Sequence, residues 1–357
     1  MDEFGAHRPS GVNRLILFLV RMGFGRGKLK RVFSRAWQAS SPDTPVDFAY
    51  HGLRLRLRPV GNTIESKILF SSRLREAEEL AFIRQYLTGG GCFVDIGANV
   101  GYYALMAAHA GATQVLAAEP NPELVDRFAA NITLNGHDQQ ITILPVAIGA
   151  ADDTARLHLK QGDTGGSSIV RNVAADGAID VPVRPLAALL AEHGVTAVDA
   201  MKIDIEGMDL FCCETLLHFD EKPKFISIES EKIKYEQLCI EINLFEKLGY
   251  NKFKVIQQDG ISKQKEKIPC TEGKYLDYKF LEGSSGLFGN DLPGEWLSSQ
   301  ETYNKYKKIF YYYKMFGDNS LLRKFFLTKI MLKLFRKLTG IPTPGWYDTH
   351  AKHSGLK

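Results

Sequence analysis

Apolar and polar positions alternate between Leu53 and Leu57, where arginines separate the leucines. A period of two is typical of a half-buried strand, so residues 47–59 are expected to form a small hairpin. Over residues 72–87 the apolar spacing changes to three and four. This spacing predicts an amphipathic helix, which ends at a run of three glycines.

From residue 92 onward the pattern alternates between short apolar runs and helical periods. Strands are expected over residues 92–96, 114–118, 141–148, 200–205, 224–228 and 252–256. Helices are expected over residues 102–109, 122–134, 186–193 and 232–248, with a turn-rich stretch at 150–185. Strands that alternate with helices predict a parallel, doubly wound α/β sheet with both faces covered.

Four segments follow from this pattern. They are a basic arm or helix (1–46), a hairpin with a lead-in helix (47–90), the α/β domain (91–260) and a C-terminal extension (261–357). The extension contains a turn-rich, aromatic stretch near 283–296, typical of either a substrate loop or a surface excursion. It also contains a basic amphipathic helix at 321–338, for which core packing is expected and a membrane surface is the alternative.

The amino-acid composition argues against several classes of function. The 357 residues are 45% hydrophobic and 24% charged, with a net charge of +4, which is too small to indicate a nucleic-acid partner. The five cysteines lack the paired spacing of a structural zinc site, and no histidines pair at a metal-ligand spacing. We therefore expect a reduced, cytoplasmic protein without a bound structural metal.

Arginine gives way to lysine near residue 211. Residues 1–210 hold 16 Arg and 5 Lys, whereas residues 211–357 hold 2 Arg and 22 Lys. Either residue serves on a solvated surface, so folding does not demand the change. It indicates a difference in genetic origin. Because it falls inside the strand and helix pattern of one domain, we do not expect a domain boundary there.

The N-terminal segment combines apolar residues 15–20 with basic residues over 14–31. The apolar run is far shorter than the roughly 20 residues that span a bilayer. It also lacks the charge order and cleavage site of a secretory signal. A surface helix or arm is expected, with peripheral contact to the inner membrane face as the alternative.

A glycine turn leaves the first strand of the α/β domain. Gly97 and Gly101 would let the backbone approach a ligand there, and Glu119 ends the next strand, 24 residues after Asp95. A carboxylate at that place can accept hydrogen bonds from both hydroxyls of a ribose. The three residues between the glycines depart from the G-x-G-x-x-G turn that holds a pyrophosphate, which disfavours a nicotinamide cofactor.

The strings VDIGANVGYY, AAEPNP, PVAIG, GGSS and MKIDIEG occur in this order within residues 76–256. Together they resemble the FkbM family of S-adenosylmethionine (SAM)-dependent methyltransferases. The resemblance implies the class I, Rossmann-like methyltransferase fold, a mostly parallel sheet of about seven strands, here with N- and C-terminal additions. It also implies that Asp95, Gly97, Asn99 and Gly101 line the methionine half of SAM, that Glu119 holds its ribose, and that Ser167 contacts the cofactor.

Lys202, Asp204 and Glu206 recur at a period of two and so share one face of the fourth strand. Methyl transfer to a hydroxyl needs a base, and we rank Asp204 and Glu206 above Lys202 for that role. The structural alternative is a Lys202–Asp204 ion pair at the strand end. Converging carboxylates could also bind a divalent cation such as Mg²⁺.

These observations predict a SAM-dependent O-methyltransferase that acts on a hydroxyl of a sugar, glycan or natural product. The acceptor is expected to be a small molecule, a glycan or a glycolipid. A methyltransferase for a protein or lipid head group is the first alternative. A SAM-fold binding or scaffold protein without catalysis is the second, against which the intact Asp95, Glu119, Asp204 and Glu206 argue. No DNA-methyltransferase box follows the fourth strand.

Overall fold

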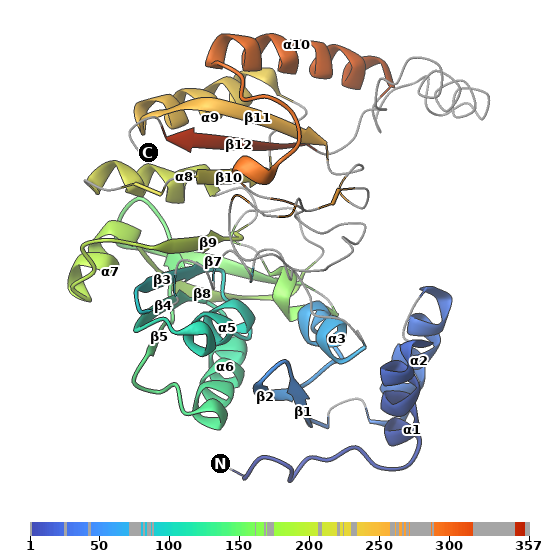
Figure 1. The fold of residues 1–357 in the computed structure, drawn as a ribbon. Helices are drawn as coiled ribbons and strands as arrows, with labels where there is room; N and C mark the ends of the chain where they lie inside the picture. Colours follow the sequence, from blue (N-terminus) through green and yellow to red (C-terminus); the bar gives the residue numbers. More distant parts are fainter. Residues whose placement is uncertain are drawn as a thin grey trace. The chain divides into compact units, whose positions relative to one another are not determined.

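A computed structural model describes most of the chain (Figure 1). The described residues are 2–24, 27–41, 44–70, 80, 83, 87, 89–160, 162–167, 169, 175–205, 209–219, 222–223, 225–229, 234–257, 261, 264–265, 268, 271, 287, 289–316 and 347–353. Two compact units contain residues 1–215 and 216–357. The change from arginine to lysine lies within a few residues of this division, and the expectation that no domain boundary lies there stays a prediction. The predicted segment limits at 46, 90 and 260 stay predictions.

The first unit begins with a helical segment and a hairpin. Helix α1 (Gly11–Leu19), the π-helical turn η1 (Val20–Phe24) and helix α2 (Gly27–Ser40) precede the antiparallel strands β1 (Val46–Tyr50) and β2 (Leu53–Leu57). The hairpin is confirmed. Its turn has positive φ at both central residues, which suits the twist of the two strands.

A parallel sheet follows, with strand order β5-β4-β3-β9. Its strands are β3 (Cys92–Ile96), β4 (Gln114–Ala118), β5 (Ile141–Leu144) and β9 (Ala200–Ile203). Helices α5 (Tyr102–Ala110) and α6 (Pro122–Asn135) pack against it, and α7 (Leu186–Glu192) precedes β9 (Figure 1). The strand order reverses between β3 and β9, which confirms the predicted α/β class with a parallel sheet.

The stretch over 150–185 is a strand pair rather than a run of turns. Strands β7 (Asp153–Lys160) and β8 (Ala175–Arg184) are antiparallel, and β8 also pairs with β6 (Ala147–Ile148). The short helix η2 (Thr164–Gly166) lies between β7 and β8. The turn-rich prediction was wrong because glycines and aspartates obscured the alternation of Leu157 and Leu159 with polar residues. The predicted strand over 141–148 is likewise two strands, β5 and β6, in different sheets.

The second unit holds a three-stranded sheet of order β10-β12-β11. Its strands are β10 (Phe225–Glu229), β11 (Tyr250–Gln257) and β12 (Tyr347–His353), with β12 antiparallel to both neighbours. Its helices are α9 (Tyr235–Lys247), η5 (Gly289–Asp291) and α10 (Ser299–Phe316). The four-stranded parallel sheet and this three-stranded sheet thus belong to different units, and one continuous seven-stranded sheet stays a prediction.

Two further short helices are α8 (Asp209–Glu214) and η3 (Thr215–His218). Within the predicted helix over 72–87, Leu80, Ile83 and Leu87 are buried, and most of its other residues lie outside the described part of the chain. The segments 283–286 and 321–338 also lie outside the described residues.

Two asparagine side chains of helix α6 hold the β1-β2 hairpin in place within the first unit. The Asn131 Oδ1 atom accepts a hydrogen bond from the Arg56 backbone N–H at 2.7 Å. One turn later, the Asn135 side chain accepts from the Arg54 N–H and donates to the Arg54 carbonyl, both at 2.8 Å. These amides satisfy backbone groups on the exposed edge of β2, which would otherwise be unpaired.

Helix α3 (Thr63–Leu69) is held by a buried ion pair. The Glu65 carboxylate is fully buried, pairs with the Arg127 guanidinium of α6 and accepts the Arg58 backbone N–H at 3.1 Å. Arg127 also donates to the Arg58 carbonyl at 3.1 Å and pairs with the exposed Glu123 at 3.0 Å. Burial lowers the pKa of Arg127 to about 10, so it remains charged at neutral pH. Two helices and the end of β2 therefore depend on one charge pair.

Replacing Glu65 should destabilise the first unit severely, because Arg127 would keep its charge without its buried partner. We expect Glu65→Ala to lower the free energy of unfolding by about 3–5 kcal/mol. Glu123→Ala, which removes the exposed partner of Arg127, should cost at most about 1 kcal/mol. The double variant Glu65→Leu/Arg127→Met should be more stable than Glu65→Ala. Urea unfolding followed by circular dichroism measures all three, and equal losses in the Glu65 and Glu123 single variants would refute the assignment.

Candidate functional site

A cavity of about 200 Å³ opens in the first unit, where β3, β4 and β9 end. These carboxyl ends flank the reversal of strand order, which is where doubly wound sheets bind ligands. Six of the nine predicted site residues line this cavity: Gly97, Asn99, Glu119, Ser167, Lys202 and Asp204. Segments that are up to about 100 residues apart in sequence thus contribute to one pocket.

The turn after β3 depends on glycine at two places. Gly97 has a φ of 75°, and a Cβ atom there would lie 2.3 Å from the Asp204 carbonyl oxygen. Gly101 has a φ of 79°, and a Cβ atom there would lie 1.9 Å from the Phe128 ring of α6. Gly97 therefore lets the ends of β3 and β9 meet at the pocket wall, whereas Gly101 serves helix packing and does not line the cavity.

Asn99 adopts a left-handed conformation with a φ of 55°, which is uncommon outside glycine. Its Oδ1 atom accepts from the Val100 backbone N–H at 2.8 Å and from the Asn62 side chain at 3.0 Å. Its own backbone N–H donates to the Glu119 carboxylate at 2.8 Å. The turn is therefore fixed from both sides by side-chain hydrogen bonds.

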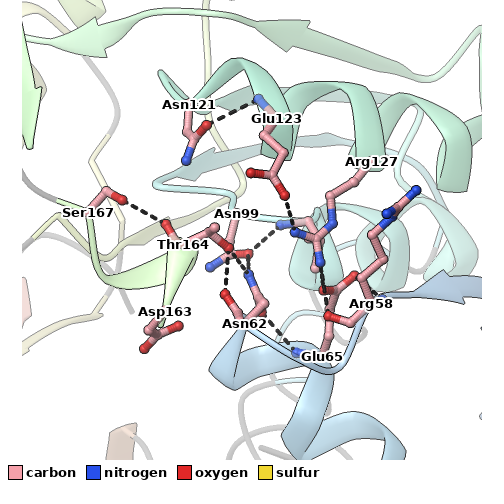
Figure 2. Close-up of polar contacts among 12 residues, drawn as sticks. Arg58, Asn62, Glu65, Asn99, Asn121, Glu123, Arg127, Asp163, Thr164 and Ser167 are labelled. Carbon is pink, nitrogen blue, oxygen red and sulfur yellow. Dashed lines mark hydrogen bonds and ion pairs between the residues drawn. The ribbon is translucent and has the colours of Figure 1, made fainter. Parts of the chain in front are cut away.

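Asn62 joins three segments around the pocket (Figure 2). Its Oδ1 atom caps α3 by accepting the Glu65 N–H at 3.0 Å, while its Nδ2 donates to Asn99 and to Thr164 Oγ1, the latter at 3.2 Å. The side chain is buried, and Ile64, two residues on, lines the cavity. The Asn62 amide thus connects the start of helix α3 to two other segments of the pocket.

The η2 turn docks on the same helix start. The Thr164 backbone N–H donates to the Gly61 carbonyl at 2.8 Å, and Asp163 accepts from the Thr63 backbone and hydroxyl at 2.9 and 2.7 Å. The Ser167 hydroxyl donates to the Thr164 carbonyl at 2.9 Å, which closes the turn (Figure 2). Ser167 therefore lines the pocket and also holds the shape of its rim. Its neighbour in the GGSS string, residue 168, lies outside the described residues.

Glu119 presents a buried carboxylate to the cavity. One oxygen accepts the Asn99 N–H and the other accepts the Asn121 N–H at 2.9 Å. Burial raises the pKa of Glu119, and these two backbone hydrogen bonds oppose the shift. Each oxygen keeps a further acceptor position, so the carboxylate can take two hydroxyl donors.

Asp95 lies behind the pocket rather than in its lining. Its Oδ2 atom accepts the Ala104 N–H of α5 at 3.2 Å, and its Oδ1 atom is buried without a hydrogen-bond partner, 3.7 Å from the Lys202 Nζ. Burial raises the pKa of Asp95, and the charge of Lys202 opposes the shift. Asp95 therefore orders the start of α5 and the position of Lys202.

Lys202 connects the two sides of the cavity. Its ammonium lies 3.2 Å from the Asp204 carboxylate, donates to the Gly97 carbonyl at 3.2 Å and sits 5.2 Å from the centre of the Tyr103 ring. The Asp204 side chain is 68% exposed, so it can reach a second molecule at the pocket mouth. The predicted alternative, a Lys202–Asp204 ion pair, is present. Glu206 lies outside the described residues.

Sequence reasoning missed the lining residues Ile64, Tyr102 and Tyr103, and it missed Asn62, which bonds to the lining residues Asn99 and Thr164. The tyrosines belong to the VDIGANVGYY string, so their proximity to the turn was a usable signal. Asn62 carried the signature of a helix N-cap, with Glu65 three residues on. Nothing in the sequence placed that cap beside residues 99 and 164. Among the described residues, no group of three or more His, Cys, Asp or Glu side chains could hold a metal ion.

Comparisons with known proteins match the part of the chain that contains this site. The family described as Methyltransferase FkbM domain matches residues 95–252. The solved structure of the methyltransferase FkbM from Methylobacillus flagellatus KT is 13% identical, with 69% of this chain and 56% of that chain covered and a TM-score of 0.32. TYW2 of M. jannaschii in complex with AdoMet is 18% identical, with 60% and 78% covered and a TM-score of 0.32.

A tRNA m1G37 methyltransferase of M. jannaschii is 27% identical, with a TM-score of 0.23, over 30% of this chain. The chain spans only 31% of the length of that protein. TM-scores this low carry no argument about function, and no curated protein matches the chain. The family match contains Asp95, Glu119, Lys202 and Asp204, and it begins in β3 and ends in β11. Residues 95–252 therefore match the methyltransferase FkbM domain, and their described part forms an α/β fold with a parallel sheet.

Proposed function

We propose that the chain binds SAM in this pocket and transfers its methyl group to a hydroxyl of a sugar, glycan or natural product. The observation that carries the proposal is the shared cavity of Glu119, the Gly97 turn, Lys202 and Asp204. It supplies a diol-binding carboxylate and an exposed carboxylate in one space. The family match supports the methyltransferase part of the proposal, and the hydroxyl acceptor rests on the chemistry of Asp204.

The residues fit the cofactor. Glu119 can accept both ribose hydroxyls, and the apolar side chains of Leu124, Ile148 and Leu157 offer a surface for a flat base. The unpartnered Oδ1 atom of Asp95 lies immediately behind the turn. The buried carboxylates of Asp95 and Glu119 favour a ligand that carries positive charge. SAM supplies an electrophilic methyl group on a sulfonium, and the protein's task is to orient an oxygen nucleophile toward it.

Asp204 is the proposed general base. Its carboxylate would take the hydroxyl proton as the acceptor oxygen forms its bond to the methyl carbon and the sulfur–carbon bond breaks. Lys202 holds Asp204 by its ion pair and keeps that carboxylate at the pocket mouth. Glu206, two residues further on, is the second candidate for the same role.

SAM affinity should depend on Glu119. We expect Glu119→Ala to weaken binding by about 1.5–3 kcal/mol, the usual value for hydrogen bonds to a charged group. Isothermal titration calorimetry with SAM measures the loss. The control is Glu123→Ala, which removes a carboxylate of α6 that does not line the cavity. The SAM affinity of this variant should match that of the wild type. Absence of SAM binding by the folded wild type, or preferential binding of NADH, would overturn the cofactor assignment.

Replacing Asp204 should lower turnover much more than it lowers the affinity for SAM. We expect Asp204→Asn to lower kcat by about 10²-fold or more, because it removes a base without removing the side chain's volume. Glu206→Gln is the parallel test. The assay uses labelled SAM with fractionated glycans, lipids and small molecules as acceptors. Unchanged kcat in both variants would refute the base, and activity that a chelator abolishes and Mg²⁺ restores would reassign these carboxylates as metal ligands.

Asn62 should act on the cofactor through Asn99 and Thr164. Asn62→Asp keeps the oxygen that caps α3 but loses the amide donor, since aspartate caps helices as well as asparagine does. We expect this variant to be less stable than the wild type, because it buries a carboxylate next to the Asn99 Oδ1 atom, and to bind SAM about 3- to 10-fold more weakly, the effect of one or two neutral hydrogen bonds. Thermal unfolding and calorimetry on the same samples separate the two effects. Wild-type affinity in Asn62→Asp would show that the amide does not order the pocket.

A further inference from the structure

The N-terminal helices carry an apolar surface that the fold leaves exposed. In the part of the chain that the structure describes, eleven large hydrophobic side chains are exposed, and seven of them lie between residues 12 and 32. They are Val12, Leu15, Phe18, Met22, Phe24, Leu29 and Val32, which we call the N-terminal apolar surface. Phe18 is 59% exposed and Met22 is 63% exposed. Such a concentration on a surface marks an interaction site rather than scattered exposure.

The N-terminal apolar surface is not the side of the helices that packs against the hydrophobic core. Helix α1 already buries a different stripe, which contains Ile16, Leu17 and, at the start of η1, Val20, in the main hydrophobic cluster of the first unit. Residues 12, 15, 18 and 22 recur at spacings of three and four, so they form a second stripe on the other side. A helix that packs through one apolar face and exposes another has a second partner.

The helices are anchored firmly enough to present this surface. The Asn13 amide of α1 donates to Ser41 Oγ at 3.0 Å and accepts from Ser40 Oγ at 2.8 Å, which ties α1 to the end of α2. Trp37 of α2 is buried, with its ring centre 5.8 Å from that of Phe70. Helices α1 and α2 also pack against each other (Figure 1). The exposed stripe therefore belongs to a folded part of the first unit.

The positive charge of the N-terminal helices distinguishes among the possible partners of this surface. Residues 8–41 contain eight arginines and lysines and no aspartate or glutamate. Arg14, Arg31 and Arg35 are exposed on the same two helices as the apolar side chains. A second copy of the chain would bring this basic surface against itself, which like-charge repulsion opposes. A nucleic acid would match the charge but would leave the apolar side chains without a role.

We propose that the N-terminal apolar surface docks the protein onto an anionic lipid bilayer. Apolar side chains between basic residues are the composition of helices that lie in the plane of a membrane. The apolar stripe would enter the boundary between head groups and acyl chains while the arginines contact anionic head groups. No helix in the described part of the chain is long and apolar enough to cross a bilayer, so this attachment is peripheral. The inference is independent of the acceptor assigned above.

Sedimentation of the full chain with vesicles tests the proposal. The vesicles contain phosphatidylcholine alone or phosphatidylcholine with about 30% phosphatidylglycerol, at about 50 mM and about 500 mM NaCl. We expect binding to the anionic vesicles at low salt, and a partition coefficient that falls about tenfold or more at high salt or without phosphatidylglycerol. A protein that stays in the supernatant under every condition, or that binds both lipids equally, overturns the proposal.

Paired variants identify the surface. Leu15→Ser/Phe18→Ser and Arg14→Gln/Arg31→Gln/Arg35→Gln should each lower the partition coefficient about tenfold or more. The control, Leu217→Ser/Ile240→Ser, removes two exposed hydrophobic residues of the second unit and should bind as the wild type does. Circular dichroism and SAM calorimetry check that the variants fold. Equal loss in the control overturns the proposal, as does a self-association in sedimentation equilibrium that only Leu15→Ser/Phe18→Ser abolishes.

Discussion

One buried amide, that of Asn62, connects three segments around the pocket. It caps α3, holds the Asn99 turn and reaches the η2 turn, and each of its three hydrogen bonds is between 3.0 and 3.2 Å long. Asn99 in turn donates its backbone N–H to Glu119, so the order reaches the carboxylate that would bind the ribose. A pocket that binds a flexible cofactor gains affinity when its walls are ordered beforehand, because less conformational freedom is lost on binding.

Burial disfavours the ionised forms of two carboxylates here: Glu119 lines the pocket and Asp95 lies behind it. Burial raises the pKa values of Asp95 and Glu119, so ionising these carboxylates lowers the stability of the folded state. This loss of stability develops as the pH rises through the raised pKa values. Lys202 offsets part of it, since its ammonium lies near Asp95 and Asp204 and donates to the Gly97 carbonyl. One cation therefore lies near two carboxylates, Asp95 and Asp204, and a cationic ligand would offset more of the cost.

The sequence predicted the local parts of this site better than its distant ones. Strands β3 and β4 were predicted with their observed bounds, because buried parallel strands are short apolar runs with glycine or asparagine turns beside them. The Gly97 turn and Glu119 followed from spacing along one α/β unit. Strand β12 was missed: its sequence, YDTHAKH, lacks an apolar alternation, and its partners β10 and β11 lie about 100 residues or more before it. Asn62 was missed for the same reason, since long-range pairing leaves no local pattern.

The central claim is that residues before the matched family region complete the pocket. Amide hydrogen exchange tests it most directly, measured on the full chain with and without S-adenosylhomocysteine. The account predicts slower exchange on binding in residues 61–65, 97–104 and 162–167 together, with no change in β11 of the second unit. Slower exchange in 97–104 with unchanged exchange in 61–65 and 162–167 would contradict it, because the Asn62 amide would then not couple those segments to the bound ligand.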